Sequence, residues 1–361
     1  MQGLPPASDY RFKHALIQAA AYENLLKSRR QIMHRRVGEV LRDQFSTIAA
    51  AEPELLAHHF TQAGLTELAV EWWGKAGQQS LERSALVEAV EQFARALAQI
   101  ATLPATPVLR RERIKLQVAL ITPLIHVKGY AAPETKSALE EARLLIEQAQ
   151  ALGEPPEDPL LQFSVLFGVW AVNRAAFNGD ALRELATQYL ALARKQKATA
   201  PLMNGHRVMG VSLLLTGDVL EGRAHLDQAI AIYEPDEHHS LASLFATDVA
   251  VSILCYRSIA LWLLGYPSGS LADVKQALAD ARKTGQASSL MFALYHALLM
   301  NIQFGDYPLA HADADELAQL ADEKGAATWR ALEMSLRGYL LTFTGKASDA
   351  IHTITTGLTA A

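Results

Sequence analysis

A cluster of basic side chains lies in the segment "KSRRQIMHRR", which contains Arg29, Arg30, Arg35 and Arg36. Guanidinium groups bind phosphate or carboxylate oxygens through paired N–H donors, so such a cluster suits a nucleic acid or an acidic protein surface. A nucleic-acid surface needs a basic stripe with aromatic side chains beside it, whereas these arginines are distributed around an expected helix. We predict a docking surface for another domain, with a solvated face or a nucleic-acid contact as the alternatives.

Motifs for enzyme chemistry are absent from the sequence. No G-x-x-x-x-G-K-[ST], H-E-x-x-H or G-x-S-x-G pattern occurs, and the "GKA" segments at Gly74 and Gly345 lack the hydroxyl that a phosphate-binding loop needs. We therefore predict no catalytic residue, no bound cofactor and no metal. His238 and His239, which follow two acidic residues, are the alternative as metal ligands, although side chains adjacent in sequence rarely point at one ion.

The composition is that of a folded chain with a large core. The 361 residues carry a formal net charge of -5, and 50% of them are hydrophobic, which excludes a disordered chain. Cys255 is the only cysteine, so no internal disulfide is possible, and the first ten residues lack the apolar core of a signal peptide. A cytoplasmic location is predicted.

Glycines recur through the second half of the chain at intervals of 38, 48, 40 and 40 residues, at Gly179, Gly217, Gly265, Gly305 and Gly345. Each interval holds two helix-length runs that are rich in Ala and Leu. The residues five after and seven before most of these glycines are small, which lets paired helices approach closely. This period predicts an all-α fold, an α-solenoid of antiparallel helix pairs that resembles a tetratricopeptide superhelix.

Two segments interrupt the regular pattern. The long interval contains residues 233–249, "YEPDEHHSLASLFATDV", whose proline, acids and histidines predict a surface loop. Residues 284–305 contain no charged side chain, but six polar residues interrupt them, so we expect a helix buried among other helices and no membrane contact.

The N-terminal residues have a different character. Residues 9–14, "DYRFKH", alternate in the manner of a short strand, and a lone strand needs partners, which we expect upstream of Met1. In the helix that follows, Ser28 is the expected cap. The apolar stripe of this helix should contain Met33, Val37 and Leu41.

Three blocks carry a resemblance to a known family: "YRFKHALIQAAAYENLLKSRRQIMHRRVGEVL", "PELLAHHFTQAGLTELAVEWWGKAGQQSLERS" and "CYRSIALWLLGYP". They resemble the region after the ATPase module in bacterial class III adenylate/guanylate cyclase fusion proteins, which are related to LuxR-type and STAND ATPase regulators. The resemblance departs at "FATDVAV", where a glycine and a Pro-Gly pair are expected.

The resemblance implies two domains. Residues 1–45 would be the end of a winged-helix-like segment that follows an absent ATPase module, and residues 46–361 a tetratricopeptide-like superhelix. The segment "LGEPPEDP", residues 152–159, looks like a linker, so the superhelix is expected to be one array or two sub-arrays that divide there.

A ligand or peptide is expected on the concave face of such an array, which the first helix of each pair lines. Counting back from the turn glycines places a mixture of aromatic and polar side chains there. Arg207 is the sharpest candidate, because a cation in an apolar groove needs an acidic neighbour or an anionic guest. The predicted groove residues are Asn173, Asn204, Arg207, Cys255, Trp262, Phe292, Tyr295, Gln303 and Tyr339.

Three functions agree with these patterns. The first is a non-catalytic scaffold that binds a protein, peptide or effector and regulates an ATPase or nucleotide cyclase in the same polypeptide. The second is a small-molecule sensor of a signalling or transcriptional regulator, with a pocket inside the superhelix. The third is a helical enzyme whose site has no recognisable motif.

Overall fold

A computed structural model of the chain describes residues 20, 22–343, 345 and 347–360. Within these residues the chain is helical, with no β-strand, which confirms the predicted all-α solenoid. The strand predicted at residues 9–14 lies outside the described residues.

The helices of the first half are α2 (Lys27–Gln44), α3 (Ser46–Ala51), α4 (Pro53–Ala63), α5 (Thr66–Glu82), α6 (Leu86–Ile100), α7 (Pro107–Lys128), α8 (Pro133–Ala151) and α9 (Leu160–Ala175). The second half contains α10 (Gly179–Gln196), α11 (Thr199–Leu215), α12 (Val219–Ile232), α13 (Pro235–His238), the 3-10 turn η1 (His239–Leu241), α14 (Ala242–Phe245) and α15 (Val249–Leu263). It ends with α16 (Pro267–Thr284), α17 (Ala287–Phe304), α18 (Tyr307–Glu323), α19 (Ala327–Phe343) and α20 (Ala347–Ala360).

In most units a glycine in the left-handed conformation ends the first helix of the pair. At the end of α17, Gly305 has a φ of 74°, a left-handed conformation that glycine adopts without strain. Asp306 then caps α18, since its side chain accepts a hydrogen bond from the Leu309 N–H at 3.2 Å. The first unit differs, because Phe177, with a φ of 53°, takes the left-handed position and Gly179 begins α10.

The small residues predicted at helix crossings lie in contact. A Cβ atom added at Gly210 would lie 2.8 Å from the carbonyl oxygen of Gly222, and the reverse substitution would meet the Gly210 oxygen at the same distance. Gly338 approaches the Ala350 oxygen in the same way, at 3.0 Å. The close approach of α11 to α12 and of α19 to α20 therefore requires the absence of a side chain at these positions.

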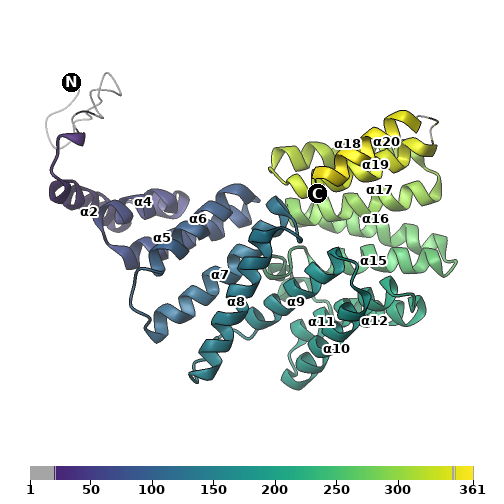
Figure 1. Cartoon of the computed structure of the whole chain (residues 1–361), viewed down its shortest axis with the longest axis horizontal. Coiled ribbons are helices and arrows are strands. Elements are labelled where there is room, and N and C mark those ends of the chain that lie inside the picture. The colour runs from purple at the N-terminus through teal and green to yellow at the C-terminus, as the bar shows by residue number, and fades with distance from the viewer. Residues whose placement is uncertain (1–19, 21, 344, 346, 361) are drawn as a thin grey trace.

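The array curves until its first and last helices meet. We call helices α2–α7 and helices α17–α20 its two arms. Figure 1 shows the chain running from α2 through α8 and α10 at the bottom and back to α17, which lies beside the turn between α5 and α6. At this junction the Ala287 N–H donates a hydrogen bond of 3.1 Å to the Ser84 hydroxyl. The indole N–H of Trp329 donates one of 3.0 Å to Nδ1 of His126. Both contacts join residues 203 positions apart in sequence.

The prediction of a surface loop at residues 233–249 is wrong for most of this segment. Residues 234–237 are exposed, but Leu241, Phe245 and Ala246 are buried in the main core cluster, and Ala242 is buried as well. We call residues 239–248 the plug, because they lie inside the curve of the superhelix. The acidic start of the segment is loop-like, whereas "LASLFA" supplies the apolar surface that the interior of a curved array needs.

Three side chains hold the plug by its backbone. The Thr122 hydroxyl donates to the Ser243 carbonyl at 2.7 Å, and the Ser164 hydroxyl donates to the Leu244 carbonyl at 2.8 Å. His126 Nε2 lies 2.8 Å from the Ala246 oxygen. Ala246 has a φ of 66°, so the "FATDVAV" segment carries an alanine in a conformation that favours glycine.

The apolar stripe predicted for the N-terminal helix is wrong for two of its three residues. Met33 and Val37 are exposed, whereas Leu41 is half-buried against the core, and α2 contacts α4 through His34 and Gly38. An added Cβ at Gly38 would lie 2.8 Å from the Phe60 ring, so the close approach at this glycine sets the buried face. Ser28 is not the cap, because the helix begins at Lys27.

The sequence predicted a buried helix in place of a membrane span, and it also predicted domain boundaries. Residues 287–304 form the buried helix expected, and no single helix in the described part of the chain is long and apolar enough to cross a membrane. The bent pair α13–α14 and α15, with an angle of 82°, meets the length and composition criteria together. The domain boundary at residue 45 and the division at 152–159 stay predictions.

The close helix approach at Gly222 leads to a first prediction. Gly222→Ala should lower the free energy of unfolding by about 1–3 kcal/mol, because its Cβ would lie 2.8 Å from the Gly210 oxygen and 2.9 Å from the Leu214 nitrogen. Urea denaturation followed by circular dichroism measures this change. Gly269→Ala is the matched control, since its Cβ would lie 3.5 Å from Leu261; it should be neutral or stabilise by up to about 1 kcal/mol. Equal stability of the two variants would contradict the close approach.

Candidate ligand cavity

The largest hollow near the predicted groove is a cavity of about 380 Å³ between the two arms of the superhelix. Side chains from α7, α9, α15, α17 and α19 line it, together with the loop that follows α7. Most of the lining is aromatic or aliphatic, with a few polar groups, which is the usual mixture in a ligand pocket. The aromatic and imidazole side chains in its wall are His126, Tyr130, Phe177, Tyr256, Phe292, Tyr295, His296 and Trp329.

His126 fixes the junction at the base of this cavity. The Trp329 indole can only donate and the Ala246 carbonyl can only accept, so His126 must carry its proton on Nε2 and a lone pair on Nδ1. Burial of the ring lowers the pKa of His126 to about 4. The neutral imidazole therefore joins α7, the plug and α19 at once.

The opposite wall is a packed set of rings on α17. Phe292 and His296 stack with their centroids 4.3 Å apart, and the Tyr295 ring lies edge-on to His296 at 5.3 Å. Nδ1 of His296 lies 2.9 Å from the Phe292 carbonyl oxygen, and burial lowers the pKa of His296 to about 4. This wall is thus neutral at physiological pH.

Two arginines lie at the inner end of the cavity. A small extension with room for about one water molecule adjoins it, and both hollows share Tyr130, Arg174, Tyr256 and Phe292 in their walls. Arg207 lines the extension and is only 2% exposed. Its guanidinium carbon lies 4.6 Å from the centroid of the Phe167 ring, and its Nη2 has no hydrogen-bond partner.

The structure brings three of the nine predicted groove residues together at this place, Arg207, Phe292 and Tyr295. Asn204 and Cys255 are buried in the core, where Asn204 donates to the Tyr189 hydroxyl at 2.7 Å. The other four lie outside the lining of both hollows: Asn173, Trp262 and Gln303 are half-buried, and Tyr339 is exposed. A role in binding stays a prediction for all nine.

Sequence reasoning missed several lining residues. One is Arg174, which directly follows the predicted Asn173. Another is Trp329 in the first turn of α19, whose partner His126 is remote in sequence. Phe177 is distinguished by its backbone conformation, which the sequence does not reveal. It is 89% exposed in a left-handed conformation at the edge of the cavity, and strained residues of this kind cluster at binding sites.

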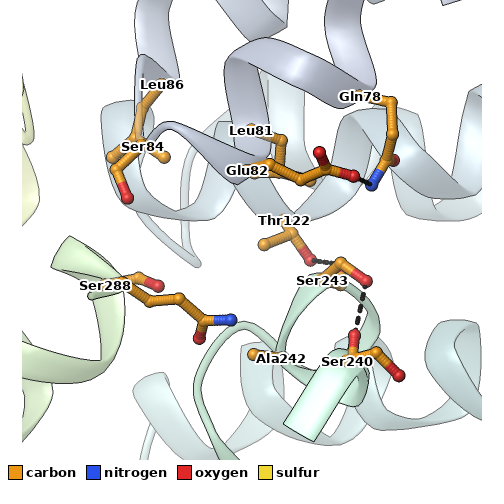
Figure 2. Close-up of a pocket in the computed structure, with 11 residues that line it drawn as sticks. Gln78, Leu81, Glu82, Ser84, Leu86, Thr122, Ser240, Ala242, Ser243 and Ser288 are labelled. Atoms are coloured by element: carbon orange, nitrogen blue, oxygen red, sulfur yellow. Dashed lines mark hydrogen bonds between the residues drawn. The ribbon is translucent and has the colours of Figure 1, made fainter. Parts of the chain in front are cut away.

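A second hollow, of about 190 Å³, lies on the junction between the arms, where α5 and α7 face the plug and α17 (Figure 2). Its wall is rich in hydroxyl and amide groups, but much of this polar surface already has partners. Figure 2 shows Thr122 bonded to Ser243 and Gln78 to Glu82, and Ser84 accepts from the Ala287 N–H. We interpret this hollow as part of the junction between the arms.

The arginines predicted to dock another domain lie on α2. Arg29, Arg35 and Arg36 are exposed, and Arg35 pairs with Glu39 at 2.8 Å. The guanidinium of Arg30 lies over the Tyr22 ring at 5.1 Å.

His238 and His239, the alternative metal ligands, have separate partners: His238 accepts from the Glu234 N–H, and His239 contacts Asp248. No group of three potential metal ligands converges within the part of the chain that the structure describes.

Solved structures with similar folds cover most of the chain. The apo form of RapI matches with a TM-score of 0.54 and 12% sequence identity over 81% of this chain and 97% of that one. A Rap protein complexed with Competence and Sporulation Factor matches with the same score and identity, over 81% and 76%. At this identity the likeness establishes the fold alone, which is a tetratricopeptide-like superhelix.

One curated protein is similar in sequence. An uncharacterized protein of Rhizobium meliloti (strain 1021) is 26% identical over 294 residues, which is 81% of this chain and 28% of the relative. The chain therefore spans less than a third of that relative's length. No model of a known protein family matches the sequence.

The buried histidines lead to a second prediction. Burial lowers the pKa of His126, His206 and His296 from 6.5 to about 4, so the unfolded chain binds protons that the folded chain does not. Stability is therefore complete above pH 6.5 and is lost as the pH falls toward 4. Each fully buried imidazole contributes roughly 3 kcal/mol to this loss. Asp313 opposes the trend, because burial raises the pKa of its carboxyl to about 6.

Urea denaturation between pH 7.5 and pH 4.5 measures the slope of stability against pH. His126→Gln should be less stable at pH 7.5 but should show a shallower slope, because one buried imidazole is gone. The matched control is His352→Gln, at an exposed position on α20, which should keep the original slope. An unchanged slope in His126→Gln would show that this ring is protonated equally in both states.

Proposed function

We propose that this chain is a non-catalytic helical-repeat scaffold that binds a peptide, a protein segment or a small effector in the aromatic cavity between its arms. The position of the cavity carries the proposal. Its wall includes His126 from α7 and Trp329 from α19, the same two residues that join the arms. A ligand in this place contacts both arms, so its binding energy stabilises one arrangement of them over others.

This coupling suits the regulation of an attached domain. We propose that the regulated unit is an ATPase or nucleotide cyclase in the same polypeptide, which docks on α2 through Arg29 and Arg36. These arginines and the apolar Met33 and Val37 are exposed on that helix, and neither arginine forms an ion pair within the described residues. The match to 28% of a longer relative supports the idea, since a similar sequence occurs there within a larger chain.

The similar solved structures are compatible with a binding role. One of them is a Rap protein in complex with Competence and Sporulation Factor, so a superhelix of this fold binds a partner. The second candidate, a sensor of small molecules, is favoured by the size of the cavity, which is within the range of small-ligand pockets. The scaffold and the sensor would bind different ligands at the same site.

Filling the cavity gives a third prediction. A thermal-shift screen of metabolites and short peptides against the chain should yield ligands that raise its melting temperature. Leu299→Trp places a large ring in the cavity wall and should abolish these shifts while the helical circular dichroism remains. Leu309→Trp, at an exposed position on α18, is the matched control and should keep them. Unchanged shifts in Leu299→Trp would place the binding site elsewhere.

The absence of phosphate-binding and cyclase motifs gives a fourth prediction. The 361-residue chain should neither hydrolyse ATP nor form a cyclic nucleotide, because its sequence has no phosphate-loop motif and no group of three potential metal ligands converges among the residues that the structure describes. Phosphate release and cyclic nucleotide formation are measured with magnesium present. Turnover that remains proportional to the chain through successive purification steps would contradict the scaffold function.

A further inference from the structure

Arg174 and Arg207 are unusual among the inward-facing arginines of this chain. Arg257 pairs with both Asp227 and Asp273, at 3.2 and 2.7 Å, and Arg337 pairs with Glu333 and Asp315. Arg174 and Arg207 form no ion pair with any described residue, although both line the inner extension of the cavity. The fold thus supplies carboxylates to other partly buried guanidinium groups and leaves these two without one.

The surroundings of Arg207 offset only part of the cost of burying it. Its guanidinium carbon lies 4.6 Å from the centroid of the Phe167 ring and 5.9 Å from that of the Phe245 ring, and both rings attract a cation. The cost of removing an ion from water is larger than such contacts return. Asp248 is the acidic residue that acts electrostatically on Arg207. Its carboxylate is already bonded to Tyr233, His239 and the Val251 N–H. A positive charge therefore remains uncompensated at the end of the cavity.

Water alone does not resolve this imbalance. The extension has room for about one water molecule, which can accept a hydrogen bond from Nη2 but carries no charge. Arg174 lies on the other side with its guanidinium 5.2 Å from the Tyr130 ring, so two cations converge on the same small space. An anion there gains charge-assisted hydrogen bonds in a site of low polarity.

The shape of the two hollows selects the kind of anion. The extension admits one small group, whereas the adjoining cavity of about 380 Å³ is lined by Tyr256, Phe292 and Tyr295. A phosphate carries four oxygens and needs more room than a carboxylate, which carries two. A carboxylate can therefore direct one oxygen toward the extension and leave an apolar or aromatic body in the wide part.

We infer that Arg174 and Arg207 form a carboxylate-binding site, and that the ligand of the cavity carries a carboxylate on an apolar or aromatic body. This inference rests on the proposed function, because it assigns the chemistry of the ligand in the same cavity. The carboxylate belongs either to a free organic acid or to the C-terminus of a peptide. Both sources present the same group to the arginines, and the experiment below separates them.

Isothermal titration calorimetry with two matched pairs of probes tests the inference on the 361-residue chain. The first pair is 3-phenylpropionate and 3-phenylpropionamide, and the second is the peptide Gly-Leu-Phe with a free or an amidated C-terminus. At least one acid should bind at least tenfold more tightly than its amide, and the pair that shows this preference identifies the source. Equal affinities within both pairs, or no binding by either acid, would overturn the inference.

Two variants locate the site. Arg207→Met and Arg174→Met keep much of the apolar stem and should each reduce the preference for the acid at least tenfold, with little change for the amide. Arg183→Met is the matched control, because Arg183 pairs with Asp218 outside the cavity, and it should keep the preference. If Arg207→Met does not fold, Arg207→Lys retains the charge and should bind the acid more weakly through the loss of paired donors.

The outcomes separate this inference from the proposed function. Acids and amides that bind equally, and that Leu299→Trp excludes, would leave the cavity as the ligand site and remove the role of the arginines. A preference for the acid that persists in both methionine variants would place the carboxylate elsewhere and overturn the inference.

Discussion

The closed form of this superhelix depends on one neutral imidazole. His126 has one N–H and one lone pair, and it uses the first on the plug and the second on Trp329. A protonated ring could only donate, so it would lose the indole as a partner. Because the ring lies on α7, the same residue ties the interior segment and the last helices to the first half of the chain.

The plug explains why the interior of the curve is solid on one side and hollow on the other. Phe245 and Leu241 fill the space between α7, α9 and α15, and the backbone carbonyls of the plug satisfy hydroxyls that would otherwise be buried without partners. Thr247 of the plug lines the small extension, and the aromatic wall of the adjoining cavity comes from other elements of the chain.

Local features of the fold could be predicted from the sequence, and remote ones could not. The contact of Gly210 with Gly222 joins residues twelve positions apart, so the spacing of small residues within one repeat was enough to place it. The contacts of Ser84 with Ala287 and of His126 with Trp329 depend on the curvature summed over many repeats, which no single repeat encodes. The plug was misassigned for the same reason, since its apolar half finds its partners on helices far along the chain.

The same distinction applies to the candidate site. Periodicity placed Phe292, Tyr295 and Arg207 on inward faces, and they do line the two hollows, but it could not show that Arg174 would face Arg207 without a carboxylate between them. Three departures from stable packing coincide here: an open cavity, an unpaired buried cation and the left-handed Phe177 at the edge. Each lowers stability by itself, and their concentration around one volume is what a binding site requires, because the groups that satisfy a ligand must be left unsatisfied without it.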